Sequence, residues 1–218
     1  GDATSPLVDD FEPIIDVILK KGDVLYIPPG YPHCGETLSL ALSYSIGFRA
    51  PSQQELLTQL ADSLIDNNSG HKRFTSASEA SDPGVVSETQ QQGIMQLLVE
   101  LATQPEKYQT MLGKLLSQNR FELDICEGEE PVTLEELQEM VQDNASIARI
   151  GGLKVLRLEN DQQCRLFING EVYPLEDVTE AQLLLLANTM TLDSVNANDL
   201  LANASIGQLL VELINQGL

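Results

Sequence analysis

The sequence has no tryptophan and few basic residues: 12 Lys and Arg stand against 33 Asp and Glu, a formal net charge of −21 over 218 residues. A surface this acidic repels phosphate backbones, so nucleic acid is a poor default partner. A basic protein or peptide suits the charge better. An acidic surface can equally serve only to keep the protein soluble, and composition alone does not decide between these interpretations.

Cysteine is scarce and shows no pairing pattern. Cys34, Cys126 and Cys164 are far apart and outside any C-x-x-C motif, so neither a disulfide framework nor a thiolate zinc site is indicated. This usage favours a reducing, cytoplasmic location. No apolar run reaches the roughly 18 residues of a membrane span, and the first residues lack the pattern of a secretory signal. The chain opens on Gly1 rather than Met, so we expect a piece of a longer protein.

Hydrophobic residue types make up 42% of the chain, enough for a globular fold with a core. Between residues 14 and 49 they come in short stretches separated by Gly and Pro, a pattern that predicts β-strands. After Pro51 the pattern changes, because Ser52 and Glu55 form a capping box and leucines follow at helical spacing. Residues 66–84 are polar and without period, which predicts a surface loop. The fold class is therefore α+β.

Two further amphipathic helices are predicted after this loop. Their apolar residues follow an i, i+3, i+4, i+7 spacing: Ile94, Leu97, Leu98 and Leu101 in the first helix, and Tyr108, Met111, Leu112 and Leu115 in the second. Pro105 suits the start of the second helix. The resulting helical module, residues 51–121, has more apolar surface than short helices can bury alone, so we expect it to share a core with a second copy in a homodimer.

The remaining residues, 122–218, predict an acidic linker followed by a winged-helix-like module. Nine acidic residues and no Lys or Arg lie between Phe121 and Ala145, and Thr133 with Glu136 forms a second capping box. The Asn169-Gly170 pair predicts a type I′ hairpin turn, because both residues tolerate a positive φ. A helix, a β-hairpin and further helices within about 80 residues are typical of a winged helix.

The most informative stretch is residues 22–33, with the sequence GDVLYIPPGYPH. Gly22 and Asp23 turn the chain, and the Pro-Pro-Gly segment fixes a rigid bend that delivers His33 at the start of the next stretch. A rigid mount suits a metal ligand, and mononuclear iron oxygenases use two His and one carboxylate. The competing interpretation is a turn histidine satisfied by backbone carbonyls.

This stretch matches the second cupin motif, G-D-x4-P-x-G-x2-H. Its local sequence, together with the later SYSIGFRAP, resembles that of the bacterial ribosomal oxygenases, which are JmjC-type cupins. The resemblance implies that residues 1–50 are the last strands of a double-stranded β-helix barrel. It also implies Fe(II) and 2-oxoglutarate as cofactors, dimerisation through the helical module, and a large-subunit ribosomal protein as the substrate, hydroxylated at an Arg. His33 would then be a metal ligand.

The sequence departs from the family pattern in one respect. The family places an H-x-D ligand pair upstream of this histidine, whereas no His precedes His33, and the only other one, His71, is followed by Lys72 and Arg73. We therefore expect the parent protein to be an active hydroxylase and this 218-residue chain to be inactive.

The stretch after His33 alternates small polar with large apolar residues. Ser43 and Ser45 lie on the small face, which in a barrel would line the space for the cosubstrate; the alternative is that this face packs beneath a helix.

Two other function classes remain open from the sequence. The winged-helix-like module could bind protein or nucleic acid beside a vestigial cupin, but residues 171–218 contain no Lys or Arg, which argues against nucleic acid. A cupin acting on a small molecule is compatible with His33 alone, and the additional helical and winged-helix-like modules make it the weaker alternative.

Overall fold

The computed structural model describes residues 10–47, 50–75, 84–125, 128 and 130–218. The chain divides into two compact units, Gly1–Arg49 and Ala50–Leu218. The first predicted strands fall in the first unit, and both the helical module and the winged-helix-like module fall in the second. No helix in the described part of the chain is long and apolar enough to cross a membrane.

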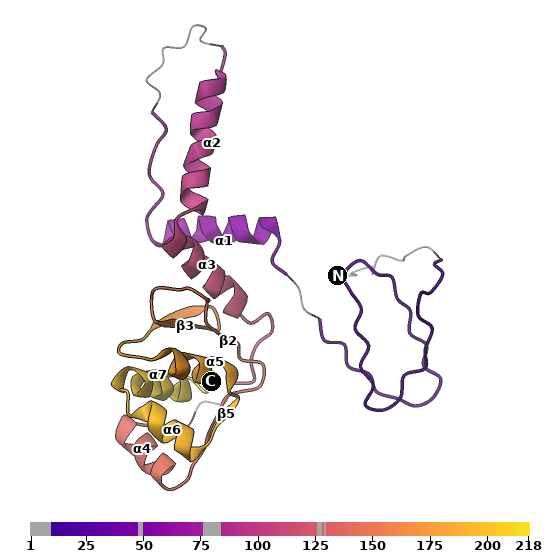
Figure 1. Cartoon of the computed structure of the whole chain (residues 1–218), viewed down its shortest axis with the longest axis vertical. Coiled ribbons are helices and arrows are strands. Elements are labelled where there is room, and N and C mark those ends of the chain that lie inside the picture. The colour runs from indigo at the N-terminus through magenta and orange to yellow at the C-terminus, as the bar shows by residue number, and fades with distance from the viewer. Residues whose placement is uncertain (1–9, 48–49, 76–83, 126–127, 129) are drawn as a thin grey trace. The chain divides into compact units, whose positions relative to one another are not determined.

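In the first unit, residues 10–47 form turns and extended stretches without a β-ladder (Figure 1). Both predicted turns are present: the Asp23 amide donates to the Lys20 carbonyl at 3.0 Å, and Gly22 and Gly30 have positive φ. The prediction of strands from residue 14 onward is wrong for these residues, since no strand forms within residues 10–47. The physical reason is that a strand is stable only when a neighbour covers its face and pairs its backbone, whereas here Ile14 is 83% exposed and Leu40 fully exposed.

The second unit begins with three helices, α1 (Gln53–Asp66), α2 (Glu88–Ala102) and α3 (Pro105–Ser117). All three were predicted, including the start of α3 at Pro105. The capping box at Ser52 and Glu55 is present, and Ser87 with Gln90 adds another. Of the predicted surface loop at 66–84, Asp66 is the last residue of α1, residues 67–75 and 84 have no helix or strand, and residues 76–83 lie outside the described part.

The winged-helix portion contains the remaining elements. Their order is α4 (Leu134–Gln142), β1 (Ile147–Ala148), β2 (Val155–Leu156), β3 (Arg165–Ile168), β4 (Glu171–Pro174), α5 (Glu180–Asn188), β5 (Thr191–Leu192), α6 (Ser194–Leu201) and α7 (Ala204–Asn215). Strands β2, β3 and β4 make one antiparallel sheet, and β1 pairs antiparallel with β5.

Short sequence motifs determine where several of these elements begin or end. Asn169 and Gly170 have φ of 48° and 84°, which is the predicted type I′ turn between β3 and β4. Thr133 caps α4, as predicted, and the hydrogen bonds from its backbone and then its hydroxyl lower the pKa of Glu136. The Glu136 carboxylate therefore stays ionised at moderately acidic pH, and its contribution to the cap is lost only as the pH falls through that lowered pKa.

One hydrophobic core lies between α4, α5, α6, α7 and the sheet strands. Leu166, Ile168, Val141, Leu200 and Ile206 are almost wholly buried in it. In the helical module, by contrast, α1 and α2 have no buried residue, and α3 buries Met111, Gly113 and Ser117. The stable centre of the second unit is thus the winged helix.

The core assignment predicts opposite outcomes for two positions on α6. Leu200 is fully buried, so Leu200→Ala should lower the free energy of unfolding by about 2–5 kcal/mol. Val195 on the same helix is 76% exposed, and Val195→Ala should change it by less than about 0.5 kcal/mol. Urea denaturation followed by circular dichroism measures both, and equal losses would contradict this core.

Candidate functional site

His33 lies just after the turn made by Pro28–Tyr31. The Tyr31 amide donates to the Pro28 carbonyl at 3.3 Å, and Gly30 at φ +83° allows the bend. The His33 ring is exposed, and its Nδ1 lies 3.5 Å from the Tyr31 carbonyl oxygen, at the outer limit of a hydrogen bond. A single long contact does not hold the imidazole, so this ring is available for another partner.

The residues around His33 do not by themselves complete an iron site. Within the described ranges, no group of three or more His, Cys, Asp or Glu side chains is placed to hold a metal ion. Cys34, next along the chain, is a free and exposed thiol. A facial triad needs two further ligands beside His33, so His33 stays a predicted ligand whose partners must come from other residues.

Ser43 and Ser45 are exposed, as are the apolar residues between and beside them, Leu42, Tyr44 and Ile46. Among residues 10–47, the structure brings neither serine to an enclosed space and places no helix over them. Their role as cosubstrate-lining residues therefore stays a prediction.

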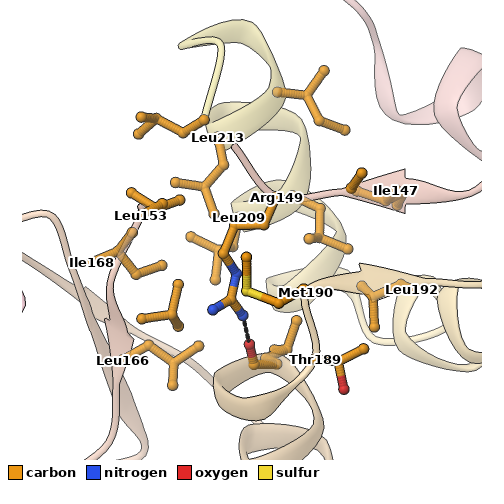
Figure 2. A pocket seen from close by; sticks show the side chains of 16 residues that line it. Ile147, Arg149, Leu153, Leu166, Ile168, Thr189, Met190, Leu192, Leu209 and Leu213 are labelled. Atoms are coloured by element: carbon orange, nitrogen blue, oxygen red, sulfur yellow. Dashed lines mark hydrogen bonds between the residues drawn. The ribbon is translucent and has the colours of Figure 1, made fainter. Parts of the chain in front are cut away.

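A small cavity of about 60 Å³ lies inside the winged helix (Figure 2). Apolar side chains from β1, β2, β3, α5, β5 and α7 enclose it, among them Ile147, Leu153, Ile168, Leu192 and Leu209. It is the size of a few methylene groups, well below the usual ligand pocket of about 300–1,000 Å³. Sequence reasoning did not identify it, because its walls come from six elements that meet only in the folded module.

Arg149 supplies the polar side of this cavity. In Figure 2 its guanidinium lies among the apolar side chains and is bonded toward the end of α5. Nη2 donates to the carbonyl oxygen of Leu186, and Nη1 donates to that of Ala187 at 3.4 Å. Burial lowers the pKa of the Arg149 guanidinium, which nevertheless remains charged at neutral pH. The arrangement is that of a cation at a helix C-terminus, where the carbonyl ends favour positive charge.

The other basic residues on and beside the hairpin also have contacts within the protein. Lys154 donates to the Gln118 carbonyl at 3.1 Å, Arg157 pairs with Glu180, and the buried Arg165 donates to Asp161 at 2.6 Å. The local field is negative: burial, then Glu212 and Glu171, raise the pKa of the Tyr173 phenol. The module therefore offers little positive charge to a phosphate backbone.

Comparison with known families places both units. Residues 99–218, more than half of the chain, match the ROXA-like winged helix family. The chain therefore belongs to the ROXA-like winged helix family. Residues 1–56 match the JmjC domain family, so His33, Ser43 and Ser45 all lie in the part that matches a JmjC domain, whereas the cavity and Arg149 lie in the winged helix.

Individual ribosomal oxygenases agree with this assignment. The chain is 35% identical over 212 residues to the ribosomal protein uL16 3-hydroxylase of Escherichia coli K12, which covers 96% of this chain and 55% of that protein. A solved structure of YcfD, a ribosomal oxygenase from E. coli, matches with a TM-score of 0.72 and 29% identity, over 79% of this chain and 47% of that one. Another, in complex with cobalt and 2-oxoglutarate, has a TM-score of 0.71 at the same identity and covers 79% and 46% of the two chains. The chain thus spans about half the length of these relatives.

The contacts of Arg149 predict a structural rather than a ligand-binding role within this winged helix. Arg149→Met should lower the free energy of unfolding by about 1–3 kcal/mol, because the terminal carbonyls of α5 lose their charged donor while the apolar lining is retained. Arg149→Lys, which keeps the charge, should recover part of this loss. Thermal unfolding measures both, and an unchanged Arg149→Met would refute the capping role.

Proposed function

We propose that this chain is part of an Fe(II)- and 2-oxoglutarate-dependent oxygenase that hydroxylates an Arg of a large-subunit ribosomal protein. The observation that carries the proposal is the His33 motif inside the JmjC match, in a chain similar over 96% of its length to a uL16 hydroxylase. Metal and cosubstrate follow from the same similarity, since the E. coli relative has been solved with cobalt and 2-oxoglutarate. Cobalt there stands in for iron.

His33 would supply one imidazole to the metal. The two other ligands would come from an H-x-D pair that precedes His33 in the longer protein, because the residues before His33 in this chain contain no histidine. Iron with 2-oxoglutarate supplies the oxidising chemistry when bound. What this chain's own residues contribute is one ligand on a rigid Pro-Pro-Gly mount, and Ser43 and Ser45 as candidate cosubstrate contacts.

Charge supports a basic protein substrate. Ribosomal proteins carry many Lys and Arg residues to bind RNA, and a chain with a formal charge of −21 attracts such a partner while repelling RNA. A substrate of this kind is made in the cytoplasm, where we place the enzyme. The alternative of a nucleic-acid-binding winged helix is disfavoured by the engaged cations Lys154, Arg157 and Arg165.

The function is tested by turnover in the parent protein, with two histidines compared. His33→Ala should abolish 2-oxoglutarate-dependent succinate formation on a ribosomal-protein peptide, because the metal loses a ligand. His71→Ala is the matched control: its Nε2 is hydrogen-bonded to Asn68, and activity should be unchanged. The 218-residue chain alone should show no turnover and bind Fe(II) weakly. Turnover by that chain, or by the His33→Ala parent, would remove His33 from the site.

We further propose that the helical module pairs with its copy in a homodimer. Along α2, Ile94, Met95, Leu98 and Val99 are 49%, 59%, 62% and 43% exposed, and no residue of α2 is buried. The opposite side of this helix is already covered, because Phe74 packs on Gly93 and Lys72 pairs with Glu100. An apolar stripe left open beside a covered side suits a second amphipathic helix.

The dimer proposal predicts different outcomes for two substitutions that add the same charge to α2. Leu98→Asp should yield a monomer, because burying a carboxylate in an apolar seam costs several kcal/mol. Gln96→Asp, at an exposed position on the same helix, should leave the dimer intact. Sedimentation at micromolar concentration distinguishes the two, and a monomeric unsubstituted protein would sink the proposal.

A further inference from the structure

We propose that the sheet of the winged helix serves as a structural seat for helix α3 and, through α3, positions the helices that pair in the dimer. The α3 seat consists of Lys154, Arg165, Phe167 and Gly170, on and beside β2, β3 and the hairpin turn. Helix α3 contacts all three strands of the sheet β2–β3–β4, and it also contacts α1 (Figure 1). The consequence for pairing rests on the proposed homodimer, whereas the seat itself does not.

The centre of the seat is the contact between Phe167 and Gly113. Phe167 is fully buried, and its ring lies directly on the backbone of α3: a Cβ added at Gly113 would fall 2.4 Å from two ring carbons. Such a distance is far inside van der Waals contact, so only glycine allows the helix to approach the sheet this closely. Gly113 is therefore explained by the seat, although glycine is a poor residue for a helix interior.

A buried charged network lies beside that contact. The Arg165 side chain is 4% exposed and that of Asp161 is 3% exposed, with Nε donating to Oδ2 at 2.6 Å. Arg165 Nη1 donates to the Thr110 hydroxyl on α3 at 2.7 Å, and the guanidinium lies 5.2 Å from the centroid of the Phe167 ring. A desolvated guanidinium depends on each of its partners, so this network ties α3 to β3 in one register.

The C-terminal end of α3 is held by the same sheet. The buried Ser117 accepts a hydrogen bond from the Gly170 amide at 3.0 Å, and Lys154 Nζ donates to the carbonyls of Leu116 and Gln118 at 3.4 and 3.1 Å. Lys154 thus meets the last carbonyls of α3, where a cation is favoured. The helix is held along its length and at its end.

The seat also constrains the helices before α3. Only Thr103 and Gln104 separate α2 from Pro105, whose ring fixes φ at the first turn of α3. Because α2 buries no residue of its own, its direction is set through this short connection together with the contacts of Phe74 on Gly93 and of Lys72 with Glu100. Arg120, just past the end of α3, lies 3.9 Å from Glu55 on α1. The placement of both neighbouring helices therefore depends on where the sheet holds α3.

This role explains why basic side chains on and near the hairpin point toward α3 rather than toward solvent. A hairpin that contacts phosphates must keep its cations at the surface. Here Arg165 is buried beneath α3, and Lys154 donates to a carbonyl at the C-terminal end of α3. These cations therefore contact a helix of the same chain.

The test is a substitution of Gly113, which should stabilise α3 if the helix is independent of the sheet and destabilise it if the seat holds the helix. If α3 were independent of the sheet, Gly113→Ala would stabilise it, because alanine favours a helix interior. If the seat holds, the new Cβ displaces the Phe167 ring. Hydrogen exchange of the amides of α3, β3 and β4 should then rise by about ten-fold or more in the full 218-residue chain. Lys107→Ala, an exposed position on α3, is the silent control.

A second substitution keeps the test decisive if Gly113→Ala only misfolds the chain. Phe167→Leu makes room for the new methyl group, so Gly113→Ala with Phe167→Leu should be less unstable than the sum of the single substitutions. Strict additivity, or slower exchange in Gly113→Ala, would overturn the seat.

Sedimentation of the same variants tests the link to pairing. Gly113→Ala should raise the dimer dissociation constant by about ten-fold or more although Gly113 faces the sheet, and the Phe167→Leu double variant should recover part of it. An unchanged dissociation constant alongside faster exchange would refute the positioning of the pairing helices. A monomeric unsubstituted chain would contradict the homodimer proposal. Amide hydrogen exchange in α3 would still test the seat in that case.

Discussion

The close approach of α3 to the three-stranded sheet is the constraint on which the second unit depends. The backbone at Gly113 lies directly on the buried ring of Phe167, and the buried Arg165 donates through Nη1 to Thr110 and through Nε to Asp161. Both residues lie on β3, whose other buried side chains, Leu166 and Ile168, face the winged-helix core. A single strand of four residues therefore serves the core with one set of side chains and α3 with the other.

Features encoded by neighbouring residues were predictable from the sequence. The capping boxes at Ser52 and Thr133, the start of α3 at Pro105 and the hairpin turn at Asn169-Gly170 all appear where the patterns placed them. Each depends on atoms within a few residues of one another, so local chemistry was enough. The winged helix followed from the order of such elements, and the family comparison agrees with it.

Features that depend on distant partners were not predictable. The strands from residue 14 onward need neighbours that residues 10–47 do not provide to one another, so the pattern of short apolar stretches between Gly and Pro gave the wrong prediction there. The short α6 buries Ala197, Leu200 and Leu201, an i, i+3, i+4 set that spans little more than one turn and is too short to indicate a helix by itself. Likewise, His33 could be found from its motif, whereas nothing local could supply its partner ligands, and Arg149 meets the end of α5 only after folding.

The hydrogen bond between the Gly170 amide and Ser117 has a consequence for chemical ageing. Asn-Gly is the dipeptide at which asparagine most readily deamidates, because the glycine nitrogen attacks the side-chain carbonyl carbon to close a succinimide and release ammonia. In this protein that nitrogen lies 3.0 Å from the Ser117 hydroxyl, which holds it away from the reaction. Deamidation at Asn169 therefore requires the hairpin to leave α3. The slow appearance of aspartate and isoaspartate at this residue would record, in stored protein, how often that separation occurs.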